Sequence, residues 1–161
     1  MYNYNMSAVD RQSAFDAALK YLTYRMRSES EVRKKLDEKG YEPQEIDETV
    51  EKLKQYKYID DEAFALELMR SKTAARPIGK RKLKGHFYKA GISDEHAQIA
   101  MDAYSPESEQ AACDAQFDKL AAQKGTDRAG LAKIQRALLS RGFGYEQINS
   151  SMRRYNDEYI D

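Results

Sequence analysis

The sequence predicts an all-α protein made of three tandem three-helix repeats, about nine helices in all, forming an elongated, curved array. Apolar residues recur at helical spacing along nearly the whole chain. Three glycines, Gly40, Gly91 and Gly142, follow one another at intervals of 51 residues, which indicates an internal repeat. With only 3 prolines and 8 glycines, the chain lacks the turn residues that an all-β protein needs.

The residues around the three glycines keep the same apolar register in every copy. Apolar or aromatic side chains stand eight and four residues before each glycine, and six, ten and thirteen residues after it. Because the flanking residues agree as well, the equal spacing of the glycines is not a coincidence. The positions are Val32, Leu83 and Ile134; Leu36, Phe87 and Leu138; Ile46, Ala97 and Ile148; Val50, Met101 and Met152; and Leu53, Tyr104 and Tyr155.

Capping residues mark the helices of the first repeat. A first helix is expected from about Phe15 to Met26, with a break at residues 27–28. Ser28, followed by Glu31, has the pattern of a capping box for the second helix, which should stop at Gly40. Pro43 suits the first position of a third helix, which should end near residues 56–58.

The same signals occur in the second and third repeats. Asp60 or Asp61 can cap the fourth helix, and the fifth should end at Gly91. Ser93 can cap the sixth helix, and Ser105 followed by proline should open the seventh. The eighth should end at Gly142, and the ninth follows it. We therefore predict a flexible N-terminus (1–10), repeats at 11–58, 59–105 and 106–156, and an acidic C-terminal tail (157–161).

The composition excludes several classes of protein. There is no apolar run long enough to span a membrane, and the N-terminus lacks the layout of a signal peptide, so we expect a cytoplasmic protein that does not bind membranes. A single cysteine, Cys113, excludes an internal disulfide framework, and its register with Phe117 predicts a buried apolar role.

The chain offers no convergent set of catalytic or metal-binding groups. Its 2 histidines, His86 and His96, fall on different expected helices without acids or cysteine at metal-ligand spacing. The pair Asp60–Asp61 stands where helix capping explains it. We therefore expect no enzyme and no cofactor. The 12 tyrosines are expected to be core or half-buried, with Tyr88 also able to stack on a nucleobase but more readily explained by core packing.

Charge is strongly zoned although the 27 basic and 27 acidic residues cancel. Residues 70–91 carry eight basic side chains and no acid, residues 92–118 carry seven acids and no Lys or Arg, and residues 119–155 carry eight basic residues against two acids. Charge zones of this kind indicate what the protein binds and say little about how it folds. The candidate binding residues for a phosphate backbone or an acidic protein surface are Arg70, Lys72, Arg76, Lys80, Arg81, Lys82 and Lys84, extended by Arg25, Arg27 and Arg33 in repeat one and by Arg136, Arg141, Arg153 and Arg154 in repeat three.

Four stretches occur in a fixed order along the chain: ALKYLTYR from Ala18 running into Arg27–Glu29, Leu36–Gly40, YIDD from Tyr58 with Phe64–Ala65, and the segment from Gly79 to Ile92. In this order and at this spacing they resemble the RecX family, regulators of the RecA recombinase. The chain departs from the family's pattern at His86 and Ala90, and Gly85 stands within a helix, where it costs about 1 kcal/mol relative to Ala.

The resemblance implies three-helix repeats arranged as a bent rod. It also implies that the protein, as a monomer, lodges in the groove of a RecA–single-stranded-DNA filament and modulates the recombinase, mainly by inhibition, in DNA repair. Two alternatives remain open. One is a stand-alone module that binds DNA, including duplex DNA, through a helix-turn-helix at residues 78–104. The other is a helical scaffold that meets a different protein through the acidic zone.

Overall fold

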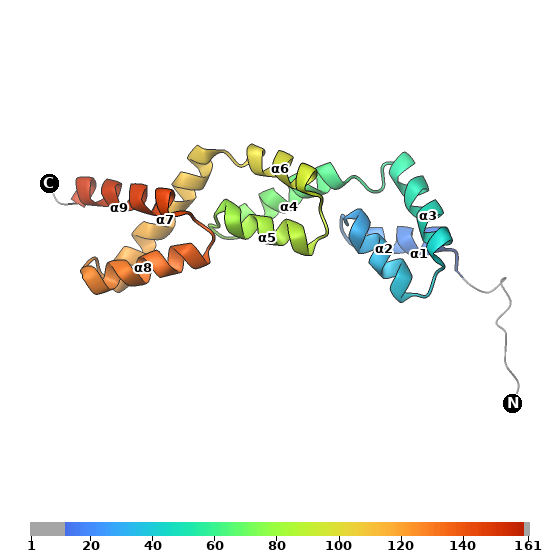
Figure 1. The fold of residues 1–161 in the computed structure, drawn as a ribbon, viewed down its shortest axis with the longest axis horizontal. Coiled ribbons are helices and arrows are strands. Elements are labelled where there is room, and N and C mark those ends of the chain that lie inside the picture. Colours follow the sequence, from blue (N-terminus) through green and yellow to red (C-terminus); the bar gives the residue numbers. More distant parts are fainter. Residues whose placement is uncertain (1–11, 160–161) are drawn as a thin grey trace, which may run out of the picture. The chain divides into compact units, whose positions relative to one another are not determined.

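The computed structural model describes residues 12–159, and these form nine α-helices and no strand (Figure 1). This confirms the predicted all-α fold of tandem three-helix repeats. The flexible N-terminus predicted for residues 1–10 lies outside the described residues, as do residues 160–161 of the predicted tail. The helices are α1 (Ala14–Leu22), α2 (Glu29–Glu38), α3 (Pro43–Gln55), α4 (Asp61–Ala75), α5 (Lys80–Lys89), α6 (Asp94–Ala103), α7 (Pro106–Lys124), α8 (Arg128–Ser140) and α9 (Tyr145–Tyr159).

The helices divide between two compact units. The N-terminal unit, Met1–Phe64, contains α1, α2 and α3, and the C-terminal unit, Ala65–Asp161, contains α5 to α9. The boundary falls inside α4. Each unit has its own packing, and the two are described separately below.

The same backbone turn closes the middle helix of every repeat. Gly40, Gly91 and Gly142 have φ of 79°, 68° and 87°, the left-handed region that side chains other than glycine rarely adopt. The amide after each glycine donates to the carbonyl five residues earlier; for Tyr41 and Leu36 the N···O distance is 3.2 Å. The N···O distance of the same bond is 3.1 Å for Ile92 and Phe87, and 3.2 Å for Phe143 and Leu138. These are Schellman caps, and they confirm the 51-residue repeat at atomic detail.

The core of the N-terminal unit comes from the apolar register around Gly40. Val32, Leu36, Val50 and Leu53 are each at most 1% exposed, and α1 packs on them through small alanines. Burying a side chain of this size stabilises the fold by about 1.5–3 kcal/mol. The predicted capping box at Ser28 is present, with reciprocal bonds to Glu31.

The core of the C-terminal unit includes a cluster formed by α7, α8 and α9. Phe117, Ile134, Leu138 and Ile148 are at most 1% exposed, and Cys113 is fully buried among them. The predicted apolar role of Cys113 is thus confirmed, and burial raises the pKa of its thiol, which makes it a poor nucleophile.

Two backbones meet directly inside the C-terminal unit, at the start of α5 and the end of α8. The Gly79 amide donates to the Arg141 carbonyl at 2.9 Å, and the Arg81 amide donates to the Gly142 carbonyl at 3.3 Å. A Cβ on Gly79 would lie 2.3 Å from the Gly142 carbonyl oxygen, so only glycine permits this approach. The unpaired N–H groups of one helix end thereby satisfy the carbonyls of another.

A carboxylate completes the same helix start. Gly79 provides no side-chain cap for α5, and Glu109 of α7 accepts a hydrogen bond from the Lys80 amide at 2.7 Å. In the N-terminal unit Asp61 plays the same part for α2, since its carboxylate accepts a hydrogen bond from the amide of Glu29, the first residue of that helix, at 2.8 Å. Asp60 caps α4, because its carboxylate accepts a hydrogen bond from the Ala63 amide at 3.0 Å. This confirms that the pair Asp60–Asp61 caps the N-termini of helices.

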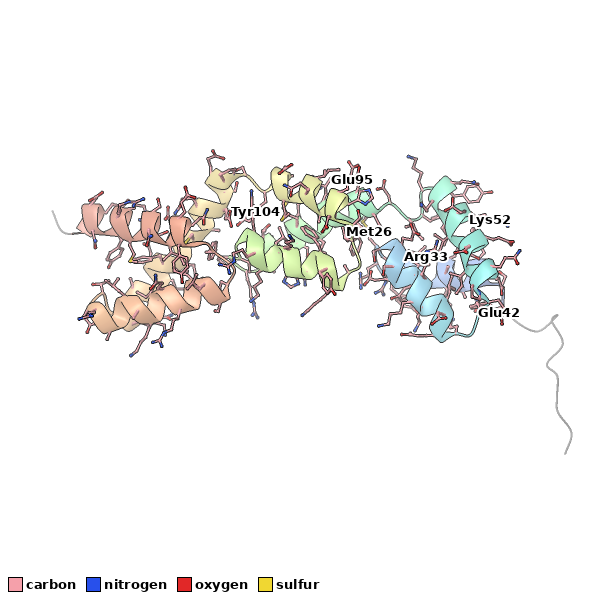
Figure 2. The ribbon with its side chains drawn as sticks, in the orientation of Figure 1. Met26, Arg33, Glu42, Lys52, Glu95 and Tyr104 are labelled. Carbon is pink, nitrogen blue, oxygen red and sulfur yellow. The ribbon has the colours of Figure 1, made fainter. Side chains whose placement is uncertain are left out.

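Two sequence expectations were wrong. The first helix ends at Leu22 instead of Met26, because Thr23 turns its hydroxyl back to the Lys20 carbonyl. Met26, labelled in Figure 2, lies beyond the helix, and 47% of its surface is exposed. Among the tyrosines whose side chains the structure describes, more are exposed than core or half-buried, since several stand at helix ends where water solvates the hydroxyl and much of the ring. The exposed ones are Tyr24, Tyr56, Tyr58, Tyr88 and Tyr145.

Candidate polyanion interface

The cations of residues 70–89 lie on α4, on α5 and on the segment between them, where water reaches them. Arg70, Arg76, Arg81, Lys82, Lys84 and Lys89 are exposed, and Lys72 and Lys80 are half-buried. Within residues 12–159, none of the eight forms an ion pair within 4.0 Å. Their mutual repulsion is therefore not offset by direct ion pairs with the acidic zone that follows them in sequence.

Helical spacing divides the cations of α5 into two rows beside its buried residues Leu83 and Phe87. Lys80, Lys84 and Tyr88 follow one another at four-residue intervals, with Arg81 beside them. Tyr88 is 85% exposed, so the expectation that it packs in the core is wrong. An aromatic face beside lysines and arginine is the combination that binds single-stranded nucleic acid in other proteins.

The second row of α5 comprises Lys82, His86 and Lys89. Burial lowers the pKa of this imidazole, and the ammonium groups of Lys72, Lys82 and Lys89 lower it further. Lys72 belongs to α4 and the other two lysines to α5, so the positive charge that acts on His86 comes from both helices. The structure therefore groups Lys72 and Lys82, two of the residues predicted from sequence, with Lys89 around His86.

In the N-terminal unit, two of the three predicted arginines are held by acids of the same unit. Arg25 pairs with Glu31 at 2.7 Å. Arg33 (Figure 2) pairs with Asp47 at 2.6 Å and with Glu29 at 2.9 Å, contacts that raise its pKa. Glu31 lies 6 residues after Arg25 and Asp47 lies 14 residues after Arg33, so helical spacing alone does not reveal these two pairs. The pair of Arg33 with Glu29 does have helical spacing, since the two residues are four apart on α2.

Arg27 lies over an aromatic ring. Its guanidinium carbon is 4.1 Å from the centroid of the Tyr21 ring, and the Lys35 ammonium lies 5.8 Å from the same centroid. The Nε of Arg27 is buried without a hydrogen-bond partner among the described residues. Two cations therefore converge on one ring, a cation–π arrangement. Lys35 was not among the residues predicted from sequence, because one lysine on a helix of mixed charge carries no signal.

In the third repeat, the acids of α7 make contacts inside their own unit. Asp114 accepts a hydrogen bond from Ser151 at 2.6 Å, and Arg154 pairs with Asp118 and, at 2.7 Å, with Glu158. Arg154 is thus occupied, although the sequence made it a candidate for the cationic track. The acids that sequence analysis grouped as one zone therefore include several with structural roles.

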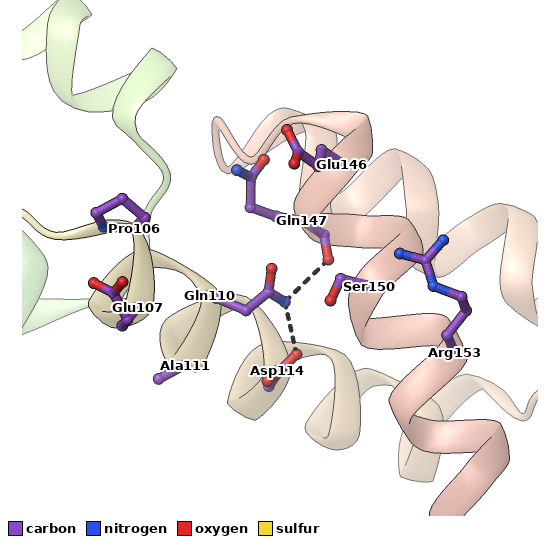
Figure 3. A pocket seen from close by; sticks show the side chains of 9 residues that line it. All are labelled: Pro106, Glu107, Gln110, Ala111, Asp114, Glu146, Gln147, Ser150 and Arg153. Carbon is purple, nitrogen blue, oxygen red and sulfur yellow. Dashed lines mark hydrogen bonds between the residues drawn. The ribbon is translucent and has the colours of Figure 1, made fainter.

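An open groove of about 530 Å³ lies between α7 and α9 (Figure 3). Gln110 bridges it by donating to the Asp114 carboxylate at 2.9 Å and to the Gln147 carbonyl at 3.1 Å. Glu107, Glu146 and Arg153 stand on its rim. Its charges are mixed and its polar groups bond to one another, so we interpret this groove as the packing interface of α7 and α9 and not as a binding site for a polyanion.

The described residues show no metal-binding constellation, since no three His, Cys, Asp or Glu side chains gather within residues 12–159. Over the same range, no helix combines the length and apolar character needed to cross a bilayer. What the geometry offers is a set of exposed cations on helices, with aromatic side chains beside them.

Comparison with known proteins identifies the fold. The family models described as the first and third three-helix domains of RecX match residues 14–53 and 107–152, together about half of the chain. The chain belongs to the RecX family. It is 31% identical over 147 residues to the regulatory protein RecX of Chlorobium phaeobacteroides, covering 91% of this chain and 96% of that protein. The RecX resemblance predicted from the sequence motifs is confirmed.

Other RecX proteins differ in length. The chain is 33% identical over 139 residues to the regulatory protein RecX of Geobacillus kaustophilus, and spans 52% of that longer protein. The crystal structure of RecX from Lactobacillus salivarius superposes with a TM-score of 0.83 at 28% identity, covering 88% of this chain and 93% of that one. A second crystal structure, of a regulatory protein RecX, gives a TM-score of 0.81 at 25% identity, covering 87% of this chain and 71% of that one.

Proposed function

We propose that this protein binds the RecA recombinase and its filament on single-stranded DNA, and that it mainly inhibits recombinase and ATPase activity in DNA repair. Membership of the RecX family supports the partner. The observation that carries the proposal is the cationic surface formed by α4, α5 and the segment between them. Six of its eight basic residues are exposed, and none of the eight has an ion-pair partner in the described chain. In this account the protein is a cytoplasmic monomer that acts by binding, without catalysis and without a cofactor.

The electrostatics favour a polyanionic partner. Eight like charges on α4, on α5 and on the segment between them repel one another, and binding to a regular array of phosphates or carboxylates relieves that repulsion. A nucleoprotein filament offers such an array at a fixed period. If separate repeats contact successive protomers, modest individual contacts combine through a high effective concentration into strong net binding.

The test is charge reversal on one row of α5. Lys80, Arg81 and Lys84 are replaced together by Glu, and inhibition of the RecA–single-stranded-DNA ATPase is titrated. We expect the half-inhibitory concentration to rise by about tenfold or more, because three phosphate or carboxylate contacts become repulsive. Acidic residues in the first turn suit the helix dipole, so α5 should remain folded.

A matched control reverses the same number of charges elsewhere in the C-terminal unit. Lys119, Lys124 and Lys133 are exposed residues of α7 and α8 without ion pairs in the described chain. Their replacement by Glu should leave inhibition within about twofold of the unmodified protein, since only distant, screened charges change. Equal loss in both triple variants would show that net charge, and not the α5 surface, governs the effect.

The stand-alone DNA-binding alternative gains support from Tyr88 beside Lys84. It predicts tight, salt-sensitive binding to naked duplex DNA and the same affinity whether or not recombinase is present. A filament-specific regulator instead binds preformed filaments more tightly than either duplex DNA or free recombinase. Parallel binding curves with the three targets separate the two functions.

A further inference from the structure

A small pocket in the N-terminal unit lies between α1 and the end of α2. Its volume is about 170 Å³. Drug-sized ligands need about 300–1,000 Å³, whereas a water molecule takes about 30 Å³, so this pocket suits one hydrated small group. It is lined by Gln12, Ala17, Lys20, Tyr21, Tyr24, Lys35 and Lys39.

The pocket is positively charged. Three of its seven lining residues are lysines, and none is an acid. Lys20 and Lys39 make no ion pair with any residue from 12 to 159, and Lys35 has one acidic neighbour, Glu38, at 4.0 Å. A neighbouring pocket on the same unit shows the contrast, because Asp37 and Asp47 line it together with Arg33 and Lys34. The lysine pocket is thus suited to an anion.

Aromatic rings stand beside the lysines. Tyr21 lines the pocket, and Arg27 and Lys35 both approach its ring, which adds a further cation to this side of the unit. Tyr24 stands at the pocket with 74% of its surface exposed. A flat, solvated ring next to cations is a platform for stacking a nucleobase, and a phosphate one linkage away can reach the ammonium groups.

We propose that this pocket binds a backbone phosphate of single-stranded DNA while a neighbouring base stacks on Tyr24. The inference deepens the proposed function, because it assigns the DNA of the filament to a second contact on the other unit. It also replaces Arg25 and Arg33, which pair with acids, by Lys20, Lys35 and Lys39 as the DNA-binding residues of repeat one.

A purely local role for the lysines makes a different prediction. Lys20 and Lys35 lie in the last turns of α1 and α2, and Lys39 caps α2, so each is near the negative end of a helix. If helix stabilisation were their sole role, substituting them would lower thermal stability and leave DNA affinity unchanged. If they bind phosphate, DNA affinity falls and its dependence on salt becomes weaker.

The chain contains 0 tryptophans, so Tyr24→Trp provides a unique fluorescent reporter at the pocket. The full-length variant is titrated with oligo(dT), without recombinase, at low and moderate salt. Stacking of thymine on the indole predicts quenching of the tryptophan emission, with a binding curve that matches the anisotropy of a labelled oligonucleotide. Oligonucleotide binding without quenching, or no binding at all, would overturn the inference.

Charge removal tests the lysines. The double substitution Lys20→Gln with Lys39→Gln should weaken oligo(dT) binding by about tenfold or more and reduce the slope of log K against log salt by roughly 0.7 per lost phosphate contact. The control, Lys34→Gln with Lys52→Gln, removes two exposed charges that do not line the pocket (Lys52 is labelled in Figure 2). Equal weakening in both pairs contradicts a pocket-specific contact.

A RecA ATPase assay on the same proteins separates this inference from the proposed function. Normal oligo(dT) binding by the Lys20/Lys39 variant, with inhibition of RecA by the unmodified chain, refutes the pocket and leaves the function standing. Pocket-dependent oligo(dT) binding by a chain that never affects RecA supports the pocket and refutes the function.

Discussion

Replacing Gly79 by Ala tests how the second and third repeats join inside the C-terminal unit. The added Cβ would lie 2.3 Å from the Gly142 carbonyl oxygen and 2.5 Å from the Phe143 nitrogen, both backbone atoms that cannot rotate away. The start of α5 must then separate from the end of α8. Two interhelix hydrogen bonds, from the Gly79 and Arg81 amides, are lost or weakened as a consequence.

The expected destabilisation follows from these contacts. Forcing one extra methyl into a close-packed site costs about 1–3 kcal/mol, and each hydrogen bond contributes about 0.5–1.5 kcal/mol net. A total of roughly 2–6 kcal/mol should lower the melting temperature by at least about 8 °C for a unit of this size. The assay is thermal unfolding followed by circular dichroism at the helix band.

A second glycine on the same helix provides the control. Gly85 lies within α5, and a Cβ there would meet nothing within 4 Å. Gly85→Ala should therefore stabilise the protein by about 1 kcal/mol through helix propensity alone. If Gly79→Ala melted within about 2 °C of the unmodified protein, the direct backbone contact between α5 and α8 would be refuted.

Two further predictions concern the surroundings of α5. Glu109→Ala should destabilise the C-terminal unit by about 1–2 kcal/mol in chemical denaturation, because the buried carboxylate that accepts the Lys80 amide is removed; Glu109→Gln should recover part of the loss, and equal loss in both would contradict a hydrogen-bonding role. By NMR titration, His86 should have a pKa below its ordinary value, and bound oligo(dT) or RecA filament should raise it by neutralising Lys72 and its neighbours. Because the pKa of His86 is then higher in the bound state, binding is accompanied by proton uptake, and the affinity increases as the pH falls. An unchanged His86 pKa at saturating ligand would show that the ligand binds elsewhere.

The helical repeat was predictable because it depends on local physics. A residue that leaves a helix through the left-handed region is best made glycine, so Gly40, Gly91 and Gly142 recur wherever the middle helix must stop. The apolar register around them follows from the helical period. The exposure of Tyr88 was not predictable in the same way, because a tyrosine beside a buried row can face either the core or water.

The candidate site was predictable only in part. The α4–α5 cations emerged because eight basic residues occur without an acid between them, which is a signal within a single segment. Arg25 and Arg33 were misleading as binding candidates because each pairs with acids of its own unit. Of these, only Glu29, four residues before Arg33 on α2, could have been found from helical spacing. Lys20 and Lys39 were missed for the opposite reason, since each stands in a sequence of mixed charge and the pocket exists only after α1 and α2 pack.

The central claim is that this protein is a multi-point ligand of the RecA–single-stranded-DNA filament. Its most direct test is a titration of the unmodified protein into preformed filaments, with ATPase rate and filament length measured together. The account predicts that both fall in a saturable way, at protein concentrations below those needed to bind oligo(dT) alone. Filaments that keep their length and ATPase rate at saturating protein would contradict it.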